Sequence, residues 1–259
     1  MSQSLWSQFL RSKALWRGLI AALALWLSAA EPARAGDHVA KTLYLNTGVG
    51  APYTTPDHKG FLDQLVSALF ARLGLEAQVM MYEATERGII NANKGIEDGL
   101  VLRVRGLEKA YPNLVMVPEK LIDNDFVAIS INHDFPVDGW ASLAPYEIAY
   151  IIGWKIFEAN LPQARQVTPV ADAGQLFTML EKDRTQVVLY ERWQGQWRLR
   201  ELGARGRILE PPLARTEMFI YLHKDRQALV GRLSEELARM KADGSYRAIF
   251  ERTLGPFPQ

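Results

Sequence analysis

Hydrophobic positions along the chain follow two alternating spacings, and this alternation predicts an α/β fold. Short runs of β-branched, aromatic and aliphatic residues predict strands at 42–46, 77–82, 100–102, 114–117, 126–131, 148–152, 166–170, 186–190 and 218–222. Apolar residues spaced three or four apart predict helices at 61–73, 86–93, 155–160, 175–182, 193–202, 229–240 and 246–254. Asp172 precedes one of these helices and is its predicted N-cap.

A polar stretch at 132–139, which contains Pro and Gly, interrupts the alternation and predicts a boundary between two lobes. The tryptophans Trp193 and Trp197 are four residues apart, so they share one helix face and are expected in the core, as is Trp140.

The N-terminal residues carry the pattern of a cleavable export signal. Three basic residues, Arg11, Lys13 and Arg17, precede the uncharged apolar run 18–28. This run is shorter than the roughly 20 residues that span a bilayer. Ala33-Arg34-Ala35 then forms a small-x-small cleavage site before Gly36. The pattern predicts a signal peptide at 1–35 and a periplasmic mature protein; an uncleaved anchor is the alternative.

The net charge and the residue types of the chain argue against several classes of function. The whole chain has a net charge of +1, and removal of the basic leader leaves about −2, which argues against nucleic acid as a partner. There are no cysteines, so disulfides, thiol nucleophiles and Cys-based metal sites are excluded. The four histidines show no metal-binding spacing and no G-x-S-x-G motif occurs, so we expect no metal, no cofactor and no enzymatic activity. Isolated glutamates such as Glu86, Glu108 and Glu191 leave an enzyme as an alternative.

Three strings in order along the chain carry a resemblance to a known family. They are TLYLNTGVGAPYTTPDHKGF from residue 42, ANKGIEDG from residue 92 and DGSYRAIFERTLG from residue 243. Together they resemble the bacterial extracellular solute-binding proteins of family 3, the amino-acid-type periplasmic binding proteins of ABC transporters, and the match spans nearly the whole mature chain.

The resemblance implies a type II periplasmic-binding-protein fold, with two small sheets flanked by helices and a two-strand hinge. Lobe 1 would comprise residues 36–131 and 215–259, and lobe 2 residues 132–214. The implied crossings lie near 130–134 and 213–217. Ligands prefer clefts between such lobes, and ligand-driven closure suits a hinge of this kind.

The resemblance also assigns ligand-binding residues. Tyr53 would pack on the ligand, Arg103 would grip a carboxylate with its guanidinium fork, and Glu191 would receive an ammonium group. The turn at Gly153 and Trp154 would hold the carboxylate at a helix N-terminus.

Each assignment has an alternative. Tyr53 could pack under its own loop, Arg105 could replace Arg103 as the clamp, and Arg103 could pair on the surface with Glu97 or Glu108. Glu191 could form an ion pair with Arg192 or Arg198.

Two departures from the family point away from an ordinary α-amino acid. Hydroxyl residues do not follow Gly153, and the family's Thr-x-x-Arg segment is replaced by the run from Arg103 to Glu108. A different carboxylate, a larger polar molecule or a cleft without a ligand fits these changes. The expected protein is a monomer that closes on a small polar ligand, an amino acid or a related carboxylate, for the membrane permease of an ABC transporter. The alternative is an accessory protein of a membrane sensor.

Overall fold

A computed structural model describes residues 42–82, 84–161 and 164–257. The predicted signal peptide and its cleavage site lie outside these residues. The strands are β1 Leu43–Thr47, β2 Ala77–Met81, β3 Gly99–Val104, β4 Leu114–Met116, β5 Ile122–Ser130, β6 Glu147–Ile151, β7 Gln166–Val170, β8 Val187–Glu191 and β9 Arg207–His223. The α-helices are α2 Phe61–Ala71, α3 Thr85–Asn93, α4 Lys155–Glu158, α5 Ala173–Glu181, α6 Arg192–Leu202, α7 Gln227–Ala242 and α8 Ser245–Thr253. Short 3-10 helices lie at Leu107–Lys109, Trp140–Leu143 and Lys224–Arg226.

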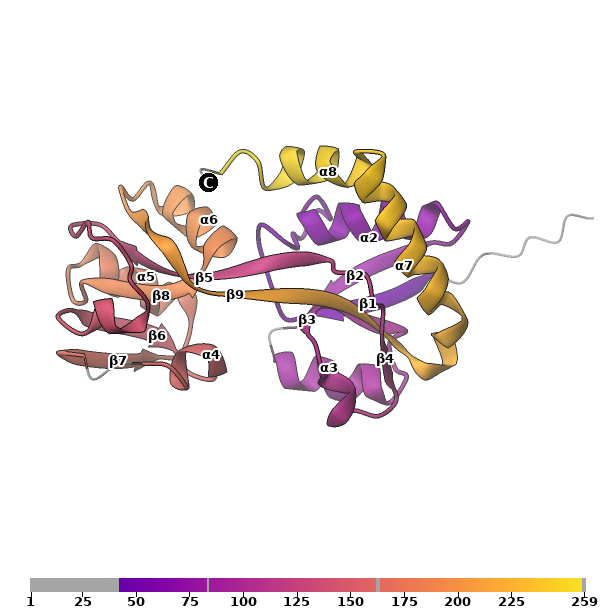
Figure 1. The fold of residues 1–259 in the computed structure, drawn as a ribbon, viewed down its shortest axis with the longest axis horizontal. Helices are drawn as coiled ribbons and strands as arrows, with labels where there is room; N and C mark the ends of the chain where they lie inside the picture. The colour runs from indigo at the N-terminus through magenta and orange to yellow at the C-terminus, as the bar shows by residue number, and fades with distance from the viewer. Residues whose placement is uncertain (1–41, 83, 162–163, 258–259) are drawn as a thin grey trace, which may run out of the picture. The chain divides into compact units, whose positions relative to one another are not determined.

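The strands form one path of hydrogen-bonded neighbours in the order β2-β1-β3-β9-β5-β8-β6-β7, and β4 pairs with β9 beside this path. At one end β1 runs parallel to β2 and β3, and at the other end β6 runs parallel to β7 and β8. Between these parallel groups, β9 and β5 pair antiparallel with each other and with their outer neighbours (Figure 1). Two parallel sheets are therefore joined by two long strands, which is the two-lobed architecture predicted from the resemblance.

The buried apolar side chains gather in separate cores. The first core contains residues of β1, β2, α2, α7 and α8, among them Leu45, Phe61 and Leu237. Residues of β6, β8 and α5, such as Ala149, Phe177 and Val188, belong to the second. A third cluster, which includes Leu143, Phe157 and Leu189, packs against the same β6 and β8 strands. A fourth cluster, which includes Leu100 and Phe219, lies on β3 and β9. We call the elements around the first and fourth clusters lobe 1 and those around the second and third lobe 2.

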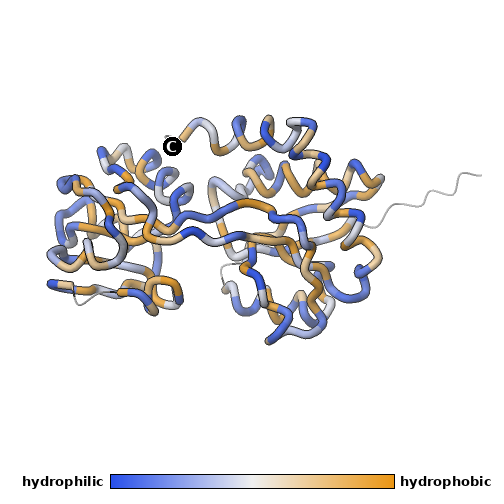
Figure 2. The backbone as a smooth tube through the Cα atoms, viewed as in Figure 1, coloured by the Kyte–Doolittle hydropathy of each residue, from blue (hydrophilic) through white to orange (hydrophobic). Residues whose placement is uncertain are grey.

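In each of the two connecting strands, β5 and β9, residues near the two ends belong to different hydrophobic cores. On β5, Ile122 belongs to the first core and Val127 to the second. On β9, Leu213 packs in lobe 2 and Met218 in lobe 1. The intervening stretches are mostly hydrophilic (Figure 2). On β5 this change lies N-terminal to the lobe boundary expected between residues 131 and 132. The division into domains stays a prediction.

Local sequence signals explain most of the elements. The apolar stripe of α2 is buried, with Leu65, Leu69 and Phe70 fully inaccessible. Asp172 caps α5 as predicted, because its carboxylate accepts a hydrogen bond from Gln175 N at 2.9 Å. Trp193 is buried in the first core and Trp197 packs against that core, as their spacing predicted.

The largest difference from the predicted elements is β9, which begins at Arg207 and not near 218. Pro211 and Pro212 do not end the strand, because residues 207–209 and 214–218 pair with β5 on either side of the prolines. Within the described ranges, no helix is both long and apolar enough to cross a membrane.

Candidate functional site

Carboxyl ends of parallel strands are where open α/β sheets bind ligands. In lobe 1 these ends belong to β1, β2 and β3, and in lobe 2 to β6, β7 and β8. Of the predicted ligand-binding residues, Arg103 lies near the end of β3, Glu191 ends β8, and Gly153 and Trp154 follow β6. Tyr53 lies in the loop between β1 and α2.

Arg103 is a buried cation. Its side chain lies on a strand whose pairing with β9 shifts register between Leu100 and Arg103, and the preceding Leu102 adopts a left-handed φ of 60°. Arg103 is only 9% exposed, and neither Nε nor Nη2 has a hydrogen-bond partner among the described residues. Such unpaired buried donors are rare because their desolvation is not offset.

The electrostatics of Arg103 agree with this isolation. Burial lowers the pKa of Arg103 to about 10, and the charge of Glu86 opposes that effect. Glu86 itself accepts a hydrogen bond from the Tyr111 hydroxyl. The guanidinium therefore has a distant carboxylate to balance its charge and no hydrogen-bonded anion in the described part of the chain.

Arg105, the alternative clamp, has different surroundings. Its side chain is exposed, its guanidinium carbon lies 4.5 Å from the centre of the Phe219 ring, and its Nη2 lies 3.7 Å from Glu217. These contacts occupy Arg105 at the surface. Arg103 near the end of β3 is therefore buried without an anion, whereas Arg105 in the turn after β3 is exposed with partners.

The end of β1 adds polar groups that the sequence analysis did not single out. Thr47 is fully buried, and no hydrogen-bond partner of its hydroxyl lies in the described residues. Asn46 is also buried; its amide nitrogen donates to Gly88 O and to Glu97, while its Oδ1 faces Gly88. The signal for both was their position, since polar residues closing an apolar strand lie at the carboxyl edge.

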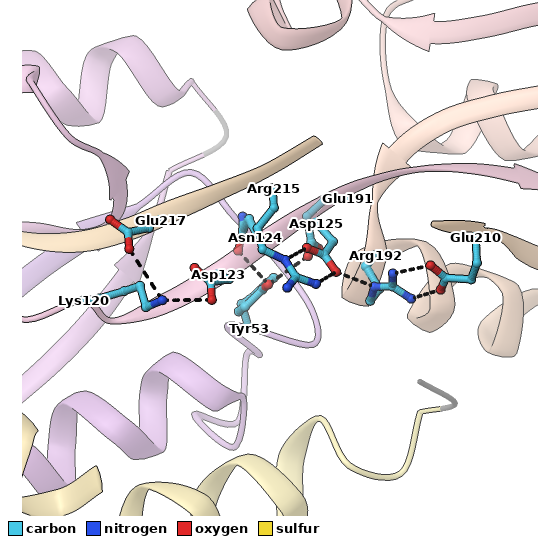
Figure 3. Close-up of polar contacts among 10 residues, drawn as sticks. All are labelled: Tyr53, Lys120, Asp123, Asn124, Asp125, Glu191, Arg192, Glu210, Arg215 and Glu217. Atoms are coloured by element: carbon cyan, nitrogen blue, oxygen red, sulfur yellow. Dashed lines mark hydrogen bonds and ion pairs between the residues drawn. The ribbon is translucent and has the colours of Figure 1, made fainter. Parts of the chain in front are cut away.

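The side chains of Tyr53 and Glu191 are hydrogen-bonded to each other (Figure 3). Tyr53 Oη lies 2.9 Å from Glu191 Oε1 and 3.0 Å from Asn124 Oδ1, and both Tyr53 and Glu191 are at most 1% exposed. The other oxygen of Glu191, Oε2, accepts from Gln194 N at 3.0 Å and caps α6. Both carboxylate oxygens of Glu191 are thus engaged within the protein.

The number of acceptor oxygens in this cluster determines where its protons can lie. Tyr53 has one hydroxyl proton for two acceptors. Burial raises the pKa of Glu191 to about 7, an effect that the backbone hydrogen bonds of Gln194 and Trp193 and the Tyr53 hydroxyl oppose and the charge of Asp125 strengthens. When Glu191 is ionised, the Tyr53 hydroxyl donates to Glu191 Oε1 or to Asn124 Oδ1. When Glu191 is protonated, its carboxyl group donates to Tyr53 and Tyr53 donates to Asn124.

The turn after β6 is also engaged. Gly153 has a left-handed φ of 87°, and its N–H donates to Glu158 Oε1 at 2.7 Å. The Trp154 ring stacks on Phe157 and Tyr190, with ring centres 5.6 Å and 4.9 Å apart. The backbone donor predicted to hold a ligand carboxylate therefore holds a carboxylate of the protein.

A second polar cluster joins the connecting strands to α6 (Figure 3). Asp125 of β5 accepts from Arg192 Nε at 3.1 Å and from Arg215 Nε at 2.6 Å. Arg192 also donates to both carboxylate oxygens of Glu210. Burial raises the pKa of Asp125, but the two arginines outweigh it and hold the pKa below its usual value. Sequence reasoning missed this network because its members come from three separate segments.

A cavity of about 550 Å³ lies beside this network. Asp125, Arg192 and Arg215 line one part of it, and Trp193 and Phe250 supply apolar walls. Each charged side chain that lines the cavity has an ion-pair partner, either in the lining or beside it. Among the described residues, no group of three or more His, Asp or Glu side chains is placed to hold a metal ion.

Comparisons with known proteins bear on the fold. No protein-family model matches the chain, and no curated protein matches it by sequence. Solved structures do match. The substrate-binding protein of an amino acid ABC transporter has a TM-score of 0.63 and 16% identity, and the alignment covers 83% of this chain and 99% of that one.

Two other solved structures show the range of proteins with this architecture. An ancestral arginine-binding protein bound to arginine has a TM-score of 0.64 at 16% identity, covering 82% of this chain and 97% of that one. A histidine kinase sensor domain with similarity to periplasmic binding proteins has a TM-score of 0.65 at 15% identity, covering 83% and 96%. This chain therefore has the two-lobed type II fold of the amino-acid-type periplasmic binding proteins.

Proposed function

We propose that this protein is a periplasmic solute-binding protein that captures a small anionic solute for an ABC transporter. The observation that carries the proposal is Arg103, a buried guanidinium without a hydrogen-bonded anion near the carboxyl end of a parallel strand. The fold supports it, since similar structures include the substrate-binding protein of an amino acid transporter. The signal-peptide pattern supports export to the periplasm.

The mechanism is binding without chemical change of the solute. A solute anion entering lobe 1 neutralises Arg103, and closure of the lobes adds contacts that the unliganded state lacks. A ligand shifts such an equilibrium only by its differential affinity for the closed state. The strands β5 and β9 link the lobes, so we expect them to carry the movement.

A second candidate is a sensor or accessory protein that reports the bound state to a membrane signalling partner. The similarity to a histidine kinase sensor domain favours it as the alternative. Both roles use the same binding step, so the partner distinguishes them: a permease and ATPase in one case, a membrane kinase in the other. Co-purification of the liganded protein with either partner separates the two.

A thermal-shift screen tests the binding step. The full chain is screened against amino acids, organic acids, amines and oligopeptides, because a ligand of the folded state raises the melting temperature. We expect a rise with anionic compounds that disappears in Arg103→Met and persists in Arg105→Met. An absence of any shift across all four classes would contradict a solute-binding role.

A further inference from the structure

The identity of the solute follows from which polar groups remain available, an inference that rests on the proposed binding role. An amino acid presents a carboxylate and an ammonium group, and each needs a partner when it leaves water. The partners predicted from the resemblance were Arg103 for the carboxylate and Glu191 for the ammonium. These two residues differ in whether their polar atoms already have hydrogen-bond partners.

Arg103 offers a fork of donors. Its unpartnered atoms are Nε and Nη2, the pair on one edge of the guanidinium that binds both oxygens of a carboxylate side-on. Water does not reach either atom, so a carboxylate engages the fork only by displacing the side chains that cover it. The buried hydroxyl of Thr47, at the end of the neighbouring strand β1, supplies a further donor at the same sheet edge.

Glu191 does not offer an ammonium group what Arg103 offers a carboxylate, because its oxygens already have partners. One oxygen receives the Tyr53 hydroxyl and the other caps α6, and the residue is 1% exposed. Burial also raises the pKa of Glu191 to about 7, which lowers the average negative charge that it presents to a cation near neutral pH. An ammonium at this position would have to break the contact with Tyr53 and leave the start of α6 without its cap.

Apolar side chains are also exposed at the ends of the parallel strands. Large hydrophobic side chains are exposed at the carboxyl ends of three strands: Met81 at 52%, Val104 at 46% and Ile152 at 59%. The Gly153 N–H is occupied by Glu158. Exposed apolar area at strand ends of both lobes, together with a lone cationic fork near one of these ends, matches a ligand with one charged end and a hydrocarbon body.

We propose that the solute is a monocarboxylate with an apolar body and no ammonium group, held through its carboxylate by Arg103. The carboxylate supplies the anion that the guanidinium lacks, and the hydrocarbon covers the exposed apolar side chains of the strand ends.

Two matched ligand series test the proposal by isothermal titration calorimetry on the full chain. The aromatic series compares hydrocinnamate, which has only a carboxylate, with L-phenylalanine, which has both groups, and phenethylamine, which has only an amine. The aliphatic series compares isocaproate, L-leucine and isoamylamine in the same way. Inorganic phosphate serves as the probe for a simple anion site. We expect the deaminated acid of at least one series to bind at least about tenfold tighter than its amino acid, with neither amine nor phosphate binding comparably.

Variants link the result to the named residue. Arg103→Met should remove acid binding and Arg103→Lys should weaken it at least about tenfold, because an ammonium lacks the planar fork. Arg105→Met is the matched control and should retain binding, and circular dichroism confirms that each variant is folded. Tighter binding of the amino acids overturns the monocarboxylate class while leaving the solute-binding role intact. No binding by any compound in either series overturns both, and acid binding unchanged by Arg103→Met overturns the role of Arg103.

Discussion

Tyr53 and Glu191, which are 138 residues apart in the chain, share a hydrogen bond of 2.9 Å in a buried position. The bond joins a loop that packs in lobe 1 to the strand end from which α6 begins in lobe 2. Asn124 of the connecting strand β5 completes the contact at 3.0 Å. A residue predicted to bind ligand thus has a second role in tying the lobes to their connection.

Glu191→Gln should change how stability depends on pH. The pKa of Glu191 is raised to about 7 in the folded protein from an ordinary 4.5, so the folded state holds the proton more tightly than the unfolded state. The stabilisation that protonation provides is full below the unfolded pKa and is lost as pH rises toward about 7, on the order of 3 kcal/mol. The Gln variant mimics the protonated acid and should lose this decline. Urea unfolding at pH 5 and pH 8 measures it.

The control for that experiment is Tyr53→Phe, which removes the hydroxyl but keeps the ring in the core. It should destabilise the protein by about 1–3 kcal/mol because Glu191 loses its partner. An equal pH dependence in wild type and Glu191→Gln would show that Glu191 does not titrate in this range.

Arg103→Met should stabilise the unliganded protein. The substitution removes a buried guanidinium whose Nε and Nη2 atoms have no partners and replaces it with an apolar side chain of similar length. We expect the free energy of unfolding to rise by about 1–3 kcal/mol. Denaturant unfolding of the two proteins without ligand measures the difference. A loss of stability would mean that the guanidinium is paired in solution, and the argument for an anion site would fail.

Asp125→Ala should be the most destabilising change in the charge network. It leaves Arg192, whose side chain is 9% exposed, with Glu210 alone. Breaking a buried pair in this way costs about 3–5 kcal/mol. Asp57→Ala, which removes an exposed partner of Lys59, is the control and should destabilise the protein much less. Similar losses in the two variants would show that the network adds little to stability.

The signal-peptide prediction has its own test. Protein expressed from the full-length sequence in a bacterial host should be recovered from the periplasm with Gly36 as its first residue. Intact-mass measurement determines the start. A protein that keeps residues 1–35 and fractionates with membranes would support the uncleaved-anchor alternative instead.

Elements set by local pattern could be predicted from the sequence. The strand at Gln166–Val170 and the helix capped by Asp172 are found where the spacing and the cap placed them, because both depend on neighbouring residues. The start of β9 could not be found in this way. Its residues from Arg207 onward are extended because β5 lies beside them, and that pairing is a tertiary contact.

The candidate site shows the same division. Arg103 could be singled out because the resemblance implies an arginine near this strand end that grips a ligand carboxylate, yet its lack of a partner appears only in the structure. The engagement of Glu191 by Tyr53 depends on two segments far apart in sequence. Thr47 carried no motif and is noticed only because its hydroxyl is buried without a partner.

A crystal structure of the protein with its bound solute tests the central claim most directly. The account predicts an anionic group within hydrogen-bond distance of Arg103 Nε and Nη2, and Glu191 still bonded to Tyr53. A solute bound in the cavity lined by Trp193 and Phe250, with Arg103 left unpaired, would contradict it.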